Sequence, residues 1–144
     1  MKYVVELLNQ DKFTQYWPLI ERQLDFVPHM WATWWTKQSL YEGVMHERFQ
    51  CWGVGDNQKI TGVIFSQVAM YPANTVFQAF LAFGDGLLEA IDEIEATFEW
   101  YCQQRGVTVA EVCGRPGWEA ILRRKGFART GTVLTRKLED RRLQ

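Results

Sequence analysis

The segment at residues 114–127, GRPGWEAILRRKGF, decides the fold. Its first four residues have the glycine and proline content of a turn, and the next eight have the composition of a short helix. Gly126 predicts the end of this helix, and Phe127 begins a return to extended chain. In an α/β domain, such a helix either closes a ligand site or covers the end of a sheet.

The chain on both sides of this segment predicts a sheet. Runs of apolar and β-branched residues predict strands at residues 3–7, 51–54, 60–68, 75–83, 107–113 and 132–138. The turn chemistry of residues 55–59 and 71–74 predicts antiparallel hairpins, whereas the last part of the chain predicts a β-α-β crossover. The sheet is therefore expected to be mixed and mostly antiparallel.

Apolar residues at helical spacing predict three helices before the quoted segment. Their ends are marked by residues suited to capping, which are Asn9 or Asp11 for the first helix, Thr36 or Ser39 for the second, and Gly106 for the third. Pro28 is expected to end the first helix. The predicted order is β-α-α-β-β-β-α-β-α-β, an α/β fold in a single domain over residues 1–144.

Composition narrows the function classes. Lys and Arg number 16 against 17 Asp and Glu, so no overall positive charge favours nucleic acid. Three cysteines without a CxxC pair, and only two histidines, argue against a zinc site and favour reduced thiols in a cytosol-like compartment. The N-terminal residues are too polar for a signal peptide, and no apolar run approaches the ~20 residues that span a bilayer. A soluble protein is expected.

The element order resembles the GNAT (Gcn5-related N-acetyltransferase) fold. Within it, the run Glu111-Val-Cys-Gly-Arg-Pro-Gly-Trp118, with Leu122 and Gly126-Phe127, resembles the GRxGW…L…GF signature of small GNAT-like proteins encoded by tailed bacteriophages. That resemblance implies a virion, assembly or ejection function, located in the virion or in the cytoplasm of the infected host. The GNAT fold implies acetyl-CoA as cofactor, bound in a V-shaped gap between the strands that end at Phe83 and Cys113.

The GNAT enzymes hold the acetyl-CoA pyrophosphate on a Gln/Arg-x-x-Gly-x-Gly/Ala loop at a helix N-terminus. The corresponding residues are Phe83, Gly84, Asp85, Gly86 and Leu87. The two glycines permit close backbone approach, but no Gln or Arg precedes them at the family's spacing. Asp85 stands where the anion would bind, so we predict a helix that Asp85 caps itself; a working phosphate loop is the alternative.

The resemblance also implies a tyrosine four residues before Gly126, which would protonate the leaving CoA thiolate. Leu122 stands there and donates no proton. Trp118 and Arg115 replace the small residue and the asparagine of the family pattern, and Trp118 is expected to intrude where CoA would run. The candidates for a general base are Glu111, Glu119, Tyr71 and His46. None has a recognisable partner in the sequence.

Two clusters predict interaction surfaces. Trp31, Trp34 and Trp35 form either a binding surface or a cover for the sheet. Around the quoted helix, Arg115, Arg123 and Arg124 belong to a basic cluster that either contacts nucleic acid phosphates or an acidic partner, or is a solvated face. The expected partners are proteins, either phage virion proteins or a second copy of the chain.

The sequence thus predicts a GNAT-like protein with a degenerate acetyl-CoA site and no cofactor, acting as a virion structural, assembly or ejection-associated component. The alternative is an active acetyl-CoA-dependent N-acetyltransferase, which the fold and the glycines Gly84 and Gly86 favour.

Overall fold

The computed structural model describes residues 2–27, 35–56, 58–113 and 116–131, together with Leu134, Arg136 and Leu138. The chain divides into two compact units, Met1–Gly114 and Arg115–Gln144. That residues 1–144 form a single domain stays a prediction. Within the described ranges, no helix is both long enough and apolar enough to cross a membrane.

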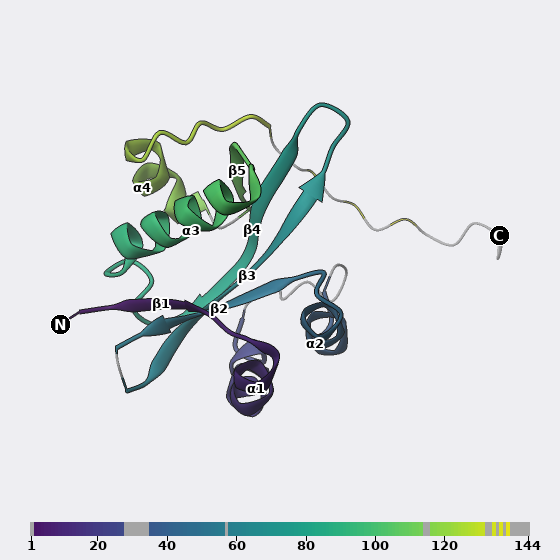
Figure 1. The fold of residues 1–144 in the computed structure, drawn as a ribbon, viewed down its shortest axis with the longest axis vertical. Helices are drawn as coiled ribbons and strands as arrows, with labels where there is room; N and C mark the ends of the chain where they lie inside the picture. The colour runs from purple at the N-terminus through teal and green to yellow at the C-terminus, as the bar shows by residue number, and fades with distance from the viewer. Residues whose placement is uncertain are drawn as a thin grey trace. The chain divides into compact units, whose positions relative to one another are not determined.

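The first unit is built on one five-stranded sheet. Its strands are β1 (Val4–Leu7), β2 (Gln50–Gly55), β3 (Ile60–Met70), β4 (Thr75–Gly84) and β5 (Val109–Val112). They lie in the order β1-β2-β3-β4-β5, and every neighbouring pair is antiparallel except β4 and β5, which are parallel (Figure 1). The mixed, mostly antiparallel sheet that the sequence predicts is therefore confirmed.

Three helices belong to the same unit: α1 (Gln10–Leu24), α2 (Lys37–Met45) and α3 (Ile91–Arg105). The predicted caps are confirmed, because Asn9 accepts a hydrogen bond from the Lys12 N–H, and Thr36 forms a capping box with Ser39. Gly106 ends α3 in the left-handed conformation, at φ 67°. α1 ends at Leu24, earlier than predicted, and Pro28 lies outside the described residues.

Aromatic side chains build a core on each face of the sheet. Phe13 of α1 packs edge-on against Phe65 of β3, on the face that also carries α2. On the opposite face, Trp52 of β2 packs against Phe98 and Tyr101 of α3. Figure 1 shows α1 and α2 on one side of the sheet and α3 on the other. Burial of each such ring contributes about 1.5–3 kcal/mol to stability.

The second unit contains the segment that decided the fold. A 3₁₀ turn (Pro116–Trp118) leads into α4 (Glu119–Arg124), and Gly126 follows with φ 91°. The predicted turn, helix and glycine stop are confirmed. The predicted final strand is not found, since Leu134, Arg136 and Leu138 are in no strand, and residues 132, 133, 135 and 137 lie outside the described residues.

Candidate functional site

The separation of β4 from β5 is the feature on which a ligand site depends. The two strands pair from Val76 with Val109 to Ala79 with Val112, and the Cys113 N–H then donates to the Ala79 carbonyl at 2.9 Å. β4 continues for five residues beyond this point, from 80 to 84. Among the described residues, no strand pairs with this continuation on the β5 side.

A β-bulge lies at the point of separation. On the other side of β4, Phe65 pairs with Leu81 but its neighbour Ser66 pairs with Ala79, so Phe80 is an extra residue in β4. A bulge bends its strand and increases the local twist. The bend accounts for the end of the β4–β5 pairing at this level of the sheet.

The unpaired edge of β4 carries hydrogen-bonding groups. The Asp85 N–H donates to the Thr61 carbonyl at 2.9 Å, so the backbone of Asp85 faces β3. Because backbone direction alternates along a strand, Gly84 and Ala82 direct their N–H and C=O groups to the β5 side. An extended chain that contains amides is suited to such an edge.

The turn after β4 needs its glycines for conformational reasons. Gly84 and Gly86 have φ values of 96° and 86°, which favour glycine. A Cβ atom on Gly84 would lie 2.3 Å from the Thr61 carbonyl oxygen, so no other residue fits there. Leu81 is buried at the position where the family pattern has Gln or Arg. The turn therefore has the two glycines of the pattern without its polar side chain.

The start of α3 corrects one prediction. The N-cap is Ala90, whose side chain makes no capping hydrogen bond, and the structure records no bond from the Asp85 carboxylate to this helix within the described residues. The backbone of Asp85 is bound to β3 instead: its N–H donates to the Thr61 carbonyl at 2.9 Å, and its carbonyl accepts from Thr61 Oγ1 at 3.0 Å. Among the described residues, no hydrogen bond from the N–H groups of residues 87–89, in the turn before α3, is found.

A row of polar side chains crosses the sheet next to the point of separation. Gln67, Gln78 and Glu111 are paired neighbours on β3, β4 and β5. The Gln67 amide donates to Gln78 at 2.7 Å, and the Gln78 amide donates to the Glu111 carboxylate at 2.5 Å. The Cys113 thiol lies 3.7 Å from the same carboxylate oxygen. The sequence prediction missed this row, although single glutamines inside otherwise apolar strands are a signal of it.

The row of polar side chains and the bulge residue Phe80 lie on the same face of the sheet. Phe77 packs on Phe98 of α3, so its neighbour Gln78 points to the opposite face, which carries α1 and α2. On that face, Phe80 stacks on Trp35 with ring centroids 4.4 Å apart. Trp35 therefore covers the sheet, as one of the two alternatives predicts, while Trp31 and Trp34 lie outside the described residues.

The thiol in this row is not poised as a nucleophile. Burial raises the pKa of Cys113 above its ordinary value, and the charge and hydrogen bond of the Glu111 carboxylate raise it further. The thiolate form is therefore suppressed at neutral pH. The described residues contain no group of three or more His, Cys, Asp and Glu that could hold a metal ion.

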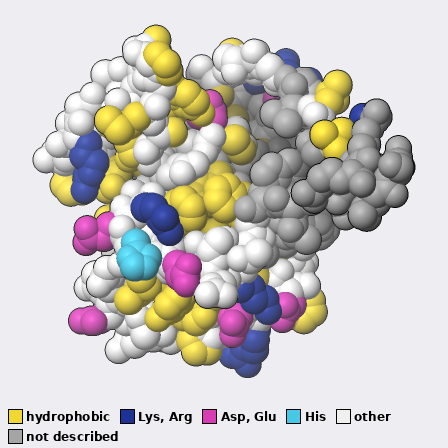
Figure 2. Space-filling view, turned by 90° about the vertical axis from the view of Figure 1, so that its right-hand side faces the viewer, with side chains coloured by type: hydrophobic (Ala, Val, Ile, Leu, Met, Phe, Trp, Pro, Cys, Tyr) yellow, Lys and Arg dark blue, Asp and Glu magenta, His cyan; other side chains and the backbone are white. Residues whose placement is uncertain are grey.

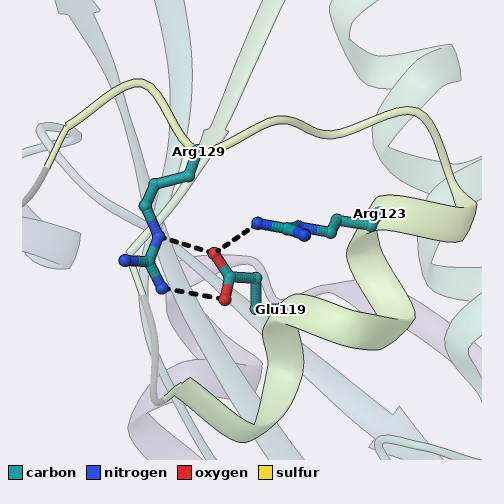
Figure 3. A network of polar contacts seen from close by, with 3 residues as sticks. All are labelled: Glu119, Arg123 and Arg129. Carbon is teal, nitrogen blue, oxygen red and sulfur yellow. Dashed lines mark hydrogen bonds and ion pairs between the residues drawn. The ribbon is translucent and has the colours of Figure 1, made fainter.

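The other candidate bases, His46, Tyr71 and Glu119, lie outside the row of polar side chains. His46 is the C-cap of α2, and Tyr71 is half exposed in the β3–β4 turn. Glu119 of α4 is held by Arg129, at 2.6 and 2.8 Å, and by Arg123 at 3.5 Å (Figure 3). These ion pairs lower the pKa of Glu119, chiefly through the Arg129 hydrogen bond.

The predicted basic cluster is described only in part. Arg123 is engaged by Glu119, Arg124 is exposed, Trp118 is half-buried, and Arg115 lies outside the described residues. On the face shown in Figure 2, described side chains of both charges are interspersed with apolar ones. The predicted protein partners stay a prediction.

Comparisons with known proteins identify the fold. No protein-family model matches the sequence, and no curated protein matches it. Among solved structures, an aminoglycoside acetyltransferase from an uncultured soil metagenomic sample has a TM-score of 0.67 at 16% identity, covering 95% of this chain and 97% of that chain. A GCN5-related N-acetyltransferase from Ralstonia eutropha JMP134 has a TM-score of 0.67 at 12% identity, covering 95% and 99%. A predicted acetyltransferase from Clostridium acetobutylicum, solved with acetyl-CoA, has a TM-score of 0.66 at 10% identity, covering 94% and 96%.

The chain therefore has the fold of the GNAT acetyltransferases, as the sequence predicts. The finer resemblance to phage proteins stays a prediction.

Proposed function

We propose that this protein is an acyl-CoA-dependent N-acyltransferase, which transfers an acyl group, acetyl in the simplest case, to an amine. The observation that carries the proposal is the separation of β4 from β5 after the Ala79–Cys113 hydrogen bond. This is where the GNAT resemblance expects acyl-CoA to lie. The solved neighbours with this fold include a structure with acetyl-CoA and one with CoA.

Two features of the first unit fit the chemistry of acyl-CoA. The pantetheine arm is an extended chain with two amides, and the open edge at Ala82 and Gly84 offers backbone groups to pair with them. The pyrophosphate is a strong acceptor, and the N–H groups of residues 87–89 lead into a 15-residue helix whose dipole favours an anion. Acyl-CoA would supply the activated acyl group as a thioester.

Two residues of the chain depart from the family pattern. The Asp85 carboxylate is exposed beside the proposed pyrophosphate position, so it would weaken binding by repulsion. Leu122 replaces the tyrosine expected to protonate the leaving thiolate. A thiol is far more acidic than an alcohol or an amine, so a CoA thiolate can leave into water with less need of a dedicated acid.

The phage virion role is the competing prediction. It rests on the GRxGW…L…GF signature, and no contact or distance among the described residues bears on it. We propose the acyltransferase because the backbone of the site has the separated strands and the uncapped helix start that acyl-CoA needs.

Calorimetric titration of the full chain with acetyl-CoA tests the proposal. We expect a dissociation constant between about 1 μM and 1 mM, the usual range for enzyme substrates. Asp85→Asn should tighten binding about threefold to tenfold, because it removes one repelling charge, and Leu88→Glu should weaken it by a similar factor. Asp56→Asn, in the β2–β3 turn, is the matched control and should change nothing.

Absence of heat and of thermal stabilisation at millimolar acetyl-CoA, in a folded wild type, would overturn the proposal. Binding that is indifferent to both Asp85→Asn and Leu88→Glu would place acetyl-CoA elsewhere. Turnover is then measured as release of the CoA thiol in the presence of a panel of primary amines.

A further inference from the structure

The Glu111 carboxylate ends a directed chain of hydrogen bonds beside the separation of β4 and β5. Resting on the proposed function, we propose that Glu111 accepts the proton of the acceptor amine, and that Gln78, backed by Gln67, is the positioning residue that fixes its carboxylate. No resemblance pointed to these two glutamines. The three residues are separated in sequence by 11 and 33 positions and meet only in the folded sheet.

The direction of these hydrogen bonds follows from the carboxylate at one end of the row. A carboxylate only accepts hydrogen bonds, so the Gln78 side chain must present its NH₂ group to Glu111. Its carbonyl oxygen then faces Gln67, whose NH₂ group donates to it at 2.7 Å. Reversal of the Gln78 amide would set two oxygens against each other. Gln67 therefore fixes the orientation of Gln78, and Gln78 fixes Glu111.

The carboxylate lies close to the proposed reaction centre. Glu111 precedes Cys113 by two residues, and Cys113 makes the hydrogen bond after which the strands separate. With a rise of about 3.3 Å per residue, Glu111 is within roughly 7 Å of that point along the strand. Its side chain is on the face of Gln78, so an acceptor would approach over the stacked rings of Trp35 and Phe80.

The side chains that position the Glu111 carboxylate are uncharged, and this matters for the reaction. An arginine or lysine would also hold the carboxylate in place, but its positive charge would repel an acceptor amine that approaches as a cation. The amides of Gln67 and Gln78 carry no charge. Among the described residues, the titratable group that contacts Glu111 is Cys113, from the same strand. The two amides face it from β3 and β4.

Glu111 takes one proton from the acceptor nitrogen while the nitrogen–carbon bond forms and the thioester carbon–sulfur bond breaks. The thiolate that leaves takes a proton from water, and Glu111 returns its own proton to water. No oxidant, reductant or metal is needed.

The first experiment uses the reactivity of the Cys113 thiol to report the position of the Glu111 carboxylate, and it needs no acyl-CoA. The pH dependence of iodoacetamide reaction is measured on the full chain in a Cys102→Ser background, since Cys51 is fully buried. Glu111→Gln should lower the apparent pKa of Cys113 and raise the reaction rate at pH 8 about threefold or more, because it removes the adjacent negative charge. Gln78→Met should give part of this effect, since a released carboxylate turns toward solvent.

Gln67→Met should act in the same direction as Gln78→Met but less strongly. The matched control is Gln38→Met, which removes a Gln–Glu hydrogen bond of 3.0 Å on α2. A Gln78→Met profile identical to that of the wild type would overturn the positioning role.

The second experiment separates this inference from the proposed function. Acetyl-CoA affinity should be unchanged in both Glu111→Gln and Gln78→Met. The rate of acetyl transfer to n-butylamine should fall at least tenfold in Glu111→Gln and about threefold in Gln78→Met. The KM for acetyl-CoA should not change in either variant. Where n-butylamine is a poor acceptor, hydrolysis of acetyl-CoA by water gives the same comparison.

Wild-type protein that binds acetyl-CoA but shows neither reaction would overturn the role of Glu111 and leave the binding proposal intact. Wild-type protein that does not bind acetyl-CoA would overturn the proposed function, and with it the base role that rests on it. The Cys113 profile would still decide whether Gln78 positions Glu111.

Discussion

The N–H of Cys113 lies 2.9 Å from the carbonyl oxygen of Ala79, and beyond this bond the described parts of β4 and β5 have no further paired residues. One residue later, Phe80 is the extra residue of the β4 bulge. The end of pairing and the bulge are thus a single structural feature. It supplies the open strand edge on which the proposed acyl-CoA site depends.

Phe80→Ala tests how firmly this region is packed. The ring is 8% exposed, stacks on Trp35 at 4.4 Å and packs edge-on against Phe49 at 5.0 Å. Its removal should lower the free energy of unfolding by about 3–5 kcal/mol, measured by urea denaturation. Phe26→Ala is the matched control, because Phe26 is 85% exposed and should change stability by less than about 0.5 kcal/mol. Equal losses in the two variants would contradict this packing.

Local patterns in the sequence were enough to predict most elements. Helix capping depends on residues within one turn, so the sequence could narrow the caps to Asn9 or Asp11, Thr36 or Ser39, and Gly106; the structure selects Asn9 and Thr36. The quoted segment likewise contains its own turn, helix and stop. The predicted final strand is wrong at Leu134, Arg136 and Leu138, because strand propensity alone does not supply the partner strand that strand formation needs.

The candidate site was harder to predict because it depends on register. Nothing near Phe80 in the sequence indicates a bulge, which arises from its pairing with residues 65 and 66 on β3. The contact of Gln78 with Glu111 likewise requires knowledge that β5 lies beside β4 in one particular register. The predicted cap at Asp85 failed because α3 begins later in the chain, with Ala90 as its N-cap.

Ser66→Ala should destabilise the core on the α3 face. The Trp52 indole N–H donates to the Ser66 hydroxyl at 2.8 Å, and both residues are buried. Removal of the hydroxyl leaves the N–H without an acceptor, so the free energy of unfolding should fall by about 1–3 kcal/mol. Trp52→Phe in the Ser66→Ala background completes a double-mutant cycle. Strict additivity of the two changes would show that this hydrogen bond contributes nothing.

Arg129→Ala should raise the pKa of Glu119. The Arg129 hydrogen bond is the largest cause that holds this pKa below its ordinary value, and Arg123 contributes less (Figure 3). The side-chain carboxyl carbon of Glu119, followed by NMR from pH 2 to 7, should therefore titrate at a higher pH in Arg129→Ala than in the wild type. Arg123→Ala should give a smaller change in the same direction. The opposite ranking of the two variants would contradict the geometry.

Cys51→Val should protect the protein from alkaline loss of stability. Cys51 is fully buried, and burial raises its pKa far above the ordinary value of 9.0. Below that value the thiol is protonated in both states, so stability is unaffected; above it, only the unfolded state loses the proton, and folding is disfavoured. The wild type should lose about 1.4 kcal/mol per pH unit relative to Cys51→Val in this range, measured by urea denaturation between pH 8 and 10.5. Comparison with Cys51→Val isolates this thiol, because the raised pKa values of Cys102, Cys113 and Tyr101 act equally in both proteins. Parallel pH dependences in the two proteins would show that Cys51 ionises in the folded state.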